Sequence, residues 1–221
     1  MIRVAVAGAA GRMGSATCDA VEGAEDMELT GRADPTLGTS VTDALGGADV
    51  LVDFTIPSQA VGNAREAAHA GVHVVIGTTG WDDGELCEAV AGAPGKVFAA
   101  ANFAIGAVLM MRFAAEASKH LQSAEIIEYH RPQKLDKPSG TAARTAAGMQ
   151  GDVPIHSVRL PGIIADQDVI LGDTGQSLII RHVTSDRTSF MPGVLLAVRQ
   201  VAELPESPVI GLDKLLWPSS P

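Results

Sequence analysis

The first hundred residues alternate short apolar runs with segments of helical spacing, and this alternation narrows the choice of fold more than any other feature. The predicted strands are Ile2–Ala7, Met27–Ala33, Val50–Phe54, Val72–Ile76 and Val97–Ala100. The predicted helices between them are Gly11–Val21, Pro57–Ala70 and Asp82–Ala91. Strands that alternate with helices through short loops favour a parallel sheet with helices on both faces and right-handed crossovers.

The pattern changes after Asn102. The predicted elements there are a helix over Ile105–His120, a strand over Ala124–Tyr129, a helix from Ser139, and strands over Ile155–Leu160, Asp168–Leu171 and Ser177–Val183. Consecutive strands without intervening helices favour an antiparallel or mixed sheet. We therefore expect an α/β fold: a Rossmann-like doubly wound sheet formed by residues 1–103 plus 193–221, and a smaller α+β domain formed by residues 104–192. A last helix, Gly193–Leu204, returns to the first domain, and a frayed tail follows at Trp217–Pro221.

The net charge of −10 at pH 7 excludes several classes of partner. A uniformly acidic chain repels nucleic acid and anionic lipid. The sequence shows neither an apolar segment of membrane-spanning length nor an export signal. Cys18 and Cys87 are interpreted as reduced thiols, and no paired-cysteine spacing predicts a metal site. We expect a cytoplasmic protein without a metal that binds neither nucleic acid nor membrane.

The segment Gly8–Gly14 has the spacing G-x-x-G-x-x-G and lies between the first predicted strand and the first predicted helix. In dinucleotide-binding folds, such glycines allow a tight turn, approach of the pyrophosphate to the backbone, and close helix–strand packing. Asp34 ends the second predicted strand, where a carboxylate binds the adenosine ribose. The alternative interpretation is a structural turn followed by an N-capping aspartate.

The same residues predict which nicotinamide cofactor is used. Asp34 disfavours a 2′-phosphate, and Pro35 adds no positive charge there. Arg12 can still pair with such a phosphate. The sequence therefore predicts NADH as the preferred cofactor and permits NADPH.

The stretch EIIEYHRPQKLDKPSGTA, residues 125–142, concentrates cations in an acidic protein. The protonatable and basic side chains are His130, Arg131, Lys134 and Lys137. Ser139 is suited to cap a helix, and the amides of Gly140 and Thr141 at its start can bind an anion. His130 can exchange a proton near neutral pH, and Lys134 can donate one. The alternative is a solvated basic turn before an ordinary capped helix.

With these motifs the chain resembles the 4-hydroxy-tetrahydrodipicolinate reductase (dihydrodipicolinate reductase) family of the diaminopimelate route to lysine. The resemblance rests on EYHRPQKLDKPSGTA and covers nearly the whole chain through VAVAGAAGRMG, VDFTIPS, VIGTTGW, AANFAIG and DRTSFMPGV. It implies reduction of a cyclic, unsaturated dicarboxylate with NADH or NADPH by a homotetramer. Residues 104–192 would then bind the substrate and form the oligomer.

The resemblance also implies a role for each matching residue. His130 would be the acid/base residue and Lys134 the proton donor. Gly140 and Thr141 would hold a substrate carboxylate, and Arg131 would contact the substrate. The residues lining the cofactor would be Gly8, Ala9, Ala10, Gly11, Arg12, Met13, Asp34, Gly77, Thr78, Thr79, Ala100, Ala101, Asn102 and Phe103.

The chain departs from the family pattern at two places. Family members often have two adjacent histidines where this chain has His130-Arg131, and Arg131 suits anion binding better than proton transfer. The connection from Ala142 to Ile155 is also short for the family. Two other functions remain open from the residues alone: a different NAD-dependent dehydrogenase of a small carboxylate, and a non-enzymatic dinucleotide-sensing module.

Overall fold

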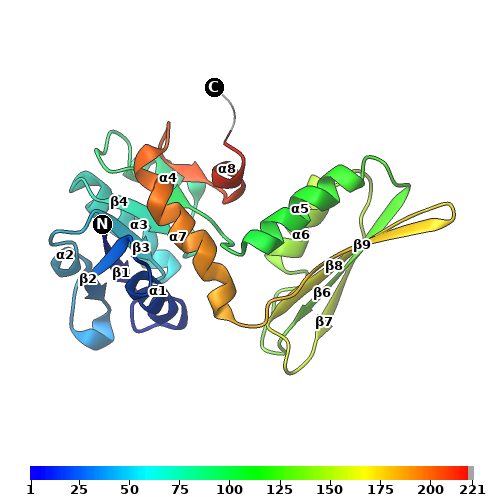
Figure 1. Ribbon diagram of the computed structural model, residues 1–221, viewed down its shortest axis with the longest axis horizontal. Helices are drawn as coiled ribbons and strands as arrows, with labels where there is room; N and C mark the ends of the chain where they lie inside the picture. Colours follow the sequence, from blue (N-terminus) through cyan, green and yellow to red (C-terminus); the bar gives the residue numbers. More distant parts are fainter. Residues whose placement is uncertain (219–221) are drawn as a thin grey trace. The chain divides into compact units, whose positions relative to one another are not determined.

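The computed structural model describes residues 1–218, which form two compact units (Figure 1). Unit 1 contains Met1–Phe103 and the chain from Phe190 onwards, and unit 2 contains Ala104–Ser189. Unit 1 has a six-stranded sheet and unit 2 a four-stranded one, which confirms the predicted fold class. The part of the predicted frayed tail beyond residue 218 lies outside the described residues.

The sheet of unit 1 is parallel throughout, in the order β10-β5-β4-β3-β1-β2. Its strands are β1 (Ile2–Ala7), β2 (Met27–Ala33), β3 (Val50–Asp53), β4 (His73–Ile76), β5 (Val97–Ala99) and β10 (Val209–Ile210). The apolar runs are continuous because both faces of the sheet are covered. The direction of the strand order reverses between β1 and β3, which is where ligands bind in sheets of this kind.

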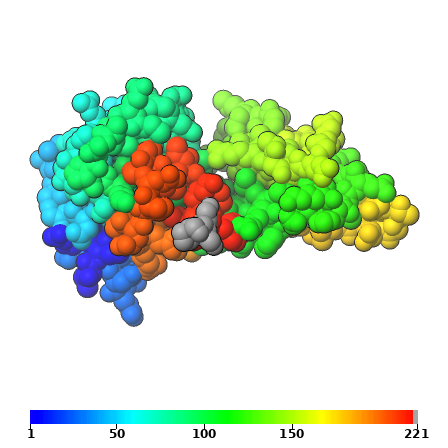
Figure 2. Space-filling view, turned by 90° about the horizontal axis from the view of Figure 1, so that it is seen from above, coloured from blue at the N-terminus to red at the C-terminus, as the bar shows by residue number. Residues whose placement is uncertain are grey.

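Helices cover both faces of this sheet. They are α1 (Arg12–Glu22), α2 (Val41–Ala44), α3 (Pro57–His69), α4 (Asp83–Ala89), α7 (Met191–Gln200) and α8 (Asp213–Leu216), with 3-10 turns at Pro35–Leu37 and Val201–Glu203. The helices α2, α3 and α4 share one apolar core with alternate residues of the strands. On the other face, α1 contacts α7 through Thr17 and Met191, and Figures 1 and 2 show α7 (orange) against the N-terminal part of the unit.

Several short elements were not predicted. The strand β10 has two residues, too few to show a period of two, and it exists because Val209 pairs with Phe98 of β5. The helix α2 has four residues and begins at a capping box formed by Ser40 and Asp43. That S-x-x-D spacing was a usable signal in the sequence. The helix α5 ends at Ala117, earlier than the predicted His120.

Unit 2 has a mixed sheet in the order β7-β6-β8-β9. Its strands are β6 (Ser123–His130), β7 (Ile155–Arg159), β8 (Ala165–Asp173) and β9 (Gln176–His182), and its helices are α5 (Ile105–Ala117) and α6 (Gly140–Gly148). The strands β6 and β7 are parallel and joined through α6, whereas β8 is antiparallel to β6 and β9. Both helices share an apolar core with the sheet around Ile126 and Val169. One loop therefore connects His130 at the end of β6 to Gly140 at the start of α6.

Two glycines allow a matched test of packing in unit 1. Gly31 lies where the register between β1 and β2 shifts, and an added Cβ would overlap the backbone of Ala44. Gly31→Ala is expected to lower the free energy of unfolding by about 1–3 kcal/mol. Gly62, exposed within α3, has open space at its Cβ position, so Gly62→Ala should raise stability by about 0.5–1 kcal/mol. Urea denaturation measures both, and equal midpoints for the two variants would contradict this account of Gly31.

Candidate active site

The glycine loop after β1 brings backbone groups close together. Gly8 has a φ of 74°, and its amide and that of Ala9 donate to the carbonyl of Ala33 at 2.9 and 3.1 Å. An added Cβ on Gly14 would overlap the carbonyl of Gly8, so α1 can approach β1 only with glycine there. The helix starts after Gly11 without a side-chain cap. Its first amides are arranged as in an anion-binding helix start.

Two adjoining clefts lie beside this loop in unit 1. One, of about 570 Å³, is lined by residues that include Gly8, Gly11 and Asp34. The other, of about 350 Å³, is lined by Arg12, Met13, Phe54, Thr55, Pro57, Gly77, Thr78 and Thr79. Both clefts share Phe54 and Thr55, which follow β3. The structure thus gathers eight of the predicted cofactor residues around the position where the strand order reverses.

The remaining predicted cofactor residues line neither of the two clefts. Ala9 and Ala10 belong to the glycine loop without lining either cleft. Ala100–Phe103 follow β5, and neither cleft includes them. Phe103 is buried, and its ring packs edge-on against Phe54, with 6.2 Å between ring centroids. Their contact with a cofactor stays a prediction.

Asp34 faces the larger cleft and also caps the turn that follows it. Its Oδ1 accepts from the amide and the hydroxyl of Thr36 at 2.9 and 2.7 Å, and its Oδ2 accepts from the amide of Ala10 at 3.2 Å. The hydrogen bond from the Thr36 hydroxyl contributes most to lowering the pKa of Asp34 below its usual value. The capping role set out as an alternative is therefore present, in a carboxylate that also lines the cleft.

Asp53, which sequence reasoning missed, ties two loops of the smaller cleft together. It is fully buried at the end of β3. Its carboxylate accepts from the hydroxyls of Thr55 and Thr78 at 2.7 and 2.9 Å and from the Asn63 amide at 2.7 Å. The V-D-F-T sequence places an acid at a strand end, but its partners from α3 and from the loop after β4 follow only from the fold.

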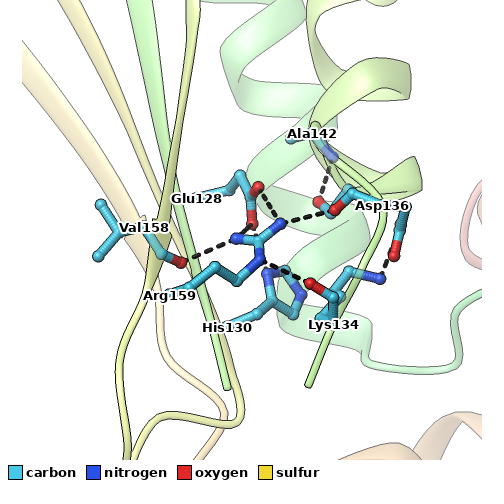
Figure 3. A network of polar contacts seen from close by, with 8 residues as sticks. Glu128, His130, Lys134, Asp136, Ala142, Val158 and Arg159 are labelled. Atoms are coloured by element: carbon cyan, nitrogen blue, oxygen red, sulfur yellow. Dashed lines mark hydrogen bonds and ion pairs between the residues drawn. The ribbon is translucent and has the colours of Figure 1, made fainter. Parts of the chain in front are cut away.

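In unit 2, the predicted acid/base residue has a buried carboxylate as partner. Glu128 and His130 alternate along β6, so they share one face of the sheet. Glu128 is fully buried and bonds to Nδ1 of His130, whose side chain is 15% exposed (Figure 3). This contact leaves Nε2 as the ring nitrogen that can exchange a proton with a ligand. An acid two residues before a histidine in a strand was the signal that sequence reasoning overlooked.

Arg159 joins this pair to the following loop. It donates to both carboxylate oxygens of Glu128 at 2.8 and 3.0 Å. The same guanidinium donates to the backbone carbonyls of Lys134 at 3.1 Å and Asp136 at 2.7 Å (Figure 3). Because Arg159 comes from β7, far along the chain, no local pattern indicated it.

The rest of the predicted cluster lies along the connection from β6 to α6. The ammonium of Lys134 is 2.9 Å from the carboxylate of Asp136. Arg131 is exposed. Ser139 caps α6 as predicted, accepting from the amide of Ala142 at 3.2 Å. Gly140 begins the helix, and apart from its chain neighbours and its own helix backbone no described atom lies within 4 Å of where its Cβ would be.

Burial and charge set the protonation of the pair. Burial would raise the pKa of Glu128, but hydrogen bonds from Arg159, Ser157 and His130 together lower it below its usual value. Burial lowers the pKa of His130, and Lys134 and Arg159 lower it further, against the opposing effect of Glu128. The imidazole therefore gives up a proton readily. A proton donor beside a helix start that can receive a carboxylate suits protonation of an anionic substrate.

Comparison with known proteins places the whole chain in one family. Residues 2–103 match the family model for the N-terminus of dihydrodipicolinate reductase, and residues 106–216 match that for its C-terminus. The chain is 44% identical over 246 residues to the 4-hydroxy-tetrahydrodipicolinate reductase of Beutenbergia cavernae, covering 97% of this chain and 98% of that protein. It is 46% identical over 248 residues to that of Thermobifida fusca, covering 98% and 99%.

A solved structure is similar over the same extent. The dipicolinate-bound dihydrodipicolinate reductase from Paenisporosarcina sp. TG-14 has a TM-score of 0.84 and 35% identity, covering 97% of this chain and 99% of that one. The resemblance stated from the motifs is confirmed by these matches. With both halves matched and relatives aligned from end to end, the chain belongs to the dihydrodipicolinate reductase family.

Proposed function

We propose that the chain reduces 4-hydroxy-tetrahydrodipicolinate to tetrahydrodipicolinate, with NADH or NADPH, in the diaminopimelate route to lysine. The observation that carries the proposal is the His130–Lys134 cluster beside the start of α6, in a chain whose first unit has a dinucleotide-type glycine loop. The dipicolinate-bound relative supports a cyclic dicarboxylate as the substrate class. No observation favours the dehydrogenase or sensor alternatives over this family activity.

The residues of unit 1 fit a nicotinamide dinucleotide. The positions of Gly8 and Gly14 have no space for a Cβ, so the backbone can be approached closely there. The amides at the start of α1 have no side-chain cap and would bind the pyrophosphate. The loop residues Gly8–Met13, together with Gly77–Thr79, would hold the phosphates, and Asp34 the adenosine ribose. When bound, the reduced nicotinamide supplies the hydride. Ala100–Phe103 are proposed to contact the nicotinamide half.

The residues of unit 2 supply the proton and bind the substrate. Arrival of a hydride builds electron density on a neighbouring atom of the unsaturated ring, and a nearby acid must neutralise it. We assign that proton to Nε2 of His130, with Lys134 as a second donor. The amides of Gly140 and Thr141, with the Arg131 guanidinium, would bind the carboxylates.

Substituting the two proton donors tests these assignments. His130→Gln and Lys134→Ala are each expected to lower kcat by about 10²- to 10⁴-fold, because the developing charge loses its acid. The assay follows NADH oxidation with the freshly made product of the preceding aldol condensation. His156→Gln is the matched control, since His156 is a half-exposed histidine of β7 paired with Glu125. Wild-type turnover in both variants would refute the assigned roles, and no turnover of the native enzyme would refute the function.

Asp34 is proposed to favour NADH, since its carboxylate would repel a 2′-phosphate. Asp34→Asn keeps a hydrogen-bond acceptor for Thr36 but removes the charge, so the ratio of kcat/KM for NADPH to that for NADH should rise by about tenfold. Asp43→Asn is the control, because Asp43 also belongs to a helix cap but lines neither cleft. An unchanged ratio in Asp34→Asn, or a native preference for NADPH, would contradict this role.

We also propose that the cytoplasmic enzyme assembles as a homotetramer through unit 2. The strand β9 is at the edge of its sheet, and Leu178 and Ile179 on it are 43% and 60% exposed. An apolar edge strand is a common association site. Light scattering after gel filtration should give four times the mass of the 22.7 kDa chain. Ile179→Lys should reduce it, and a native monomer would contradict the proposal.

A further inference from the structure

Glu128 and Arg159 form a buried ion pair, and a gain in stability is a weak explanation for burying these two charges. Both side chains are taken out of water, with exposures of 0% and 9%. Replacing a buried ion pair with apolar residues often costs little or nothing in stability, because desolvation offsets the attraction between the charges. The two residues also bond to both proposed proton donors. Glu128 bonds to Nδ1 of His130, and Arg159 donates to the backbone carbonyl of Lys134.

We propose that Glu128 and Arg159 are positioning residues that hold His130 and Lys134 in one arrangement for proton transfer. The proposal rests on the proposed function for its catalytic meaning. Neither residue is assigned a contact with substrate or cofactor.

Glu128 fixes which nitrogen of His130 carries the exchangeable proton. An ionised carboxylate only accepts hydrogen bonds, so the Nδ1 atom that it contacts must carry a hydrogen. The neutral ring is then held as one tautomer, with Nε2 ready to receive a proton and to return it. Because Glu128 is buried and held by two hydrogen bonds from Arg159, it also fixes the orientation of the ring.

Arg159 performs two tasks that only a guanidinium can combine. Its charge keeps Glu128 ionised in a buried site. Its further donors bind the carbonyls of Lys134 and Asp136, so the loop that carries the Lys134 side chain is fastened to the same point. A lysine at this position would keep the charge but has too few suitably directed donors for all these acceptors.

The proposal has a consequence for His130 that needs no substrate. The charged groups that face the ring are Glu128 from β6, Lys134 from the following loop and Arg159 from β7. Of these only Glu128 favours the imidazolium, so removing its charge lowers the pKa of His130. Deuterium exchange at the imidazole Cε1, measured by mass spectrometry across a pH series, follows this titration in the full chain.

The decisive variant is Glu128→Gln, with Glu125→Gln as its matched control. Glu125 is an exposed acid on the same strand that pairs with His156 instead. In Glu128→Gln the midpoint of the His130 exchange profile should move down by at least about half a pH unit. With the wrong tautomer accessible, kcat should fall at least about tenfold, while KM for NADH stays within about twofold. Glu125→Gln should change neither value.

Arg159→Lys tests the proposed role of Arg159 in holding the Lys134 loop. It also tests the positioning proposal if Glu128→Gln does not fold. It should keep the His130 exchange profile near that of the native protein but lower kcat about tenfold, because the Lys134 loop loses its donors. Arg181→Lys is its control, since Arg181 pairs with Asp168 at 3.2 Å and is 57% exposed. Native turnover in Arg159→Lys, or a native exchange profile in folded Glu128→Gln, would overturn the proposal.

Turnover and the His130 exchange profile together separate the proposed function from the positioning role of Glu128 and Arg159. If the native enzyme does not reduce the dicarboxylate, the proposed function fails, but the exchange profiles still decide whether Glu128 sets the protonation of His130. If His130→Gln loses activity while Glu128→Gln keeps native kcat and a native exchange profile, the proposed function stands and the positioning role fails.

Discussion

The architecture of unit 1 depends on close contacts between backbone segments that only glycine allows, because a Cβ there would overlap backbone atoms. Gly14 on α1 meets the carbonyl of Gly8, and Gly31 on β2 meets the backbone of Ala44. The first contact brings α1 down onto β1, and the second brings β2 close to α2. The first amides of α1 have no side-chain cap. The clefts beside the loop form at the same place. Close backbone packing and the two clefts thus occur together at the glycine loop of this unit.

Unit 2 is organised around a buried charge. The carboxylate of Glu128 would be costly to bury alone, and the guanidinium of Arg159 compensates that cost with two direct hydrogen bonds. Removing one partner of such a pair typically costs about 3–5 kcal/mol, whereas an exposed pair such as Glu125 with His156 contributes about 0–1 kcal/mol. The buried Glu128–Arg159 pair therefore lies in contact with both proposed proton donors.

The family assignment and the chain's departures from the family pattern are compatible. The alignment with the Beutenbergia cavernae protein spans 246 residues, more than the 221 of this chain, so that relative contains residues without a counterpart here. The described cluster is nevertheless complete from Glu128 to the cap of α6 at Ser139. Arg131 is exposed, whereas the neighbouring His130 bonds to Glu128. The proposed proton-transfer role is therefore assigned to His130 and Lys134 and not to Arg131.

Local sequence determined the strands of both units except β10, together with the glycine loop and the Ser139 cap, because strand period, turn glycines and caps act between near neighbours. The tertiary structure alone decided the pairing of Val209 with Phe98, the bonds from Asn63 and Thr78 to Asp53, and the contact of Arg159 with Glu128. Each of these joins residues that lie ten or more positions apart and share no periodic signal. Burial then makes such contacts strong, since a polar group without water must find its partner inside the protein.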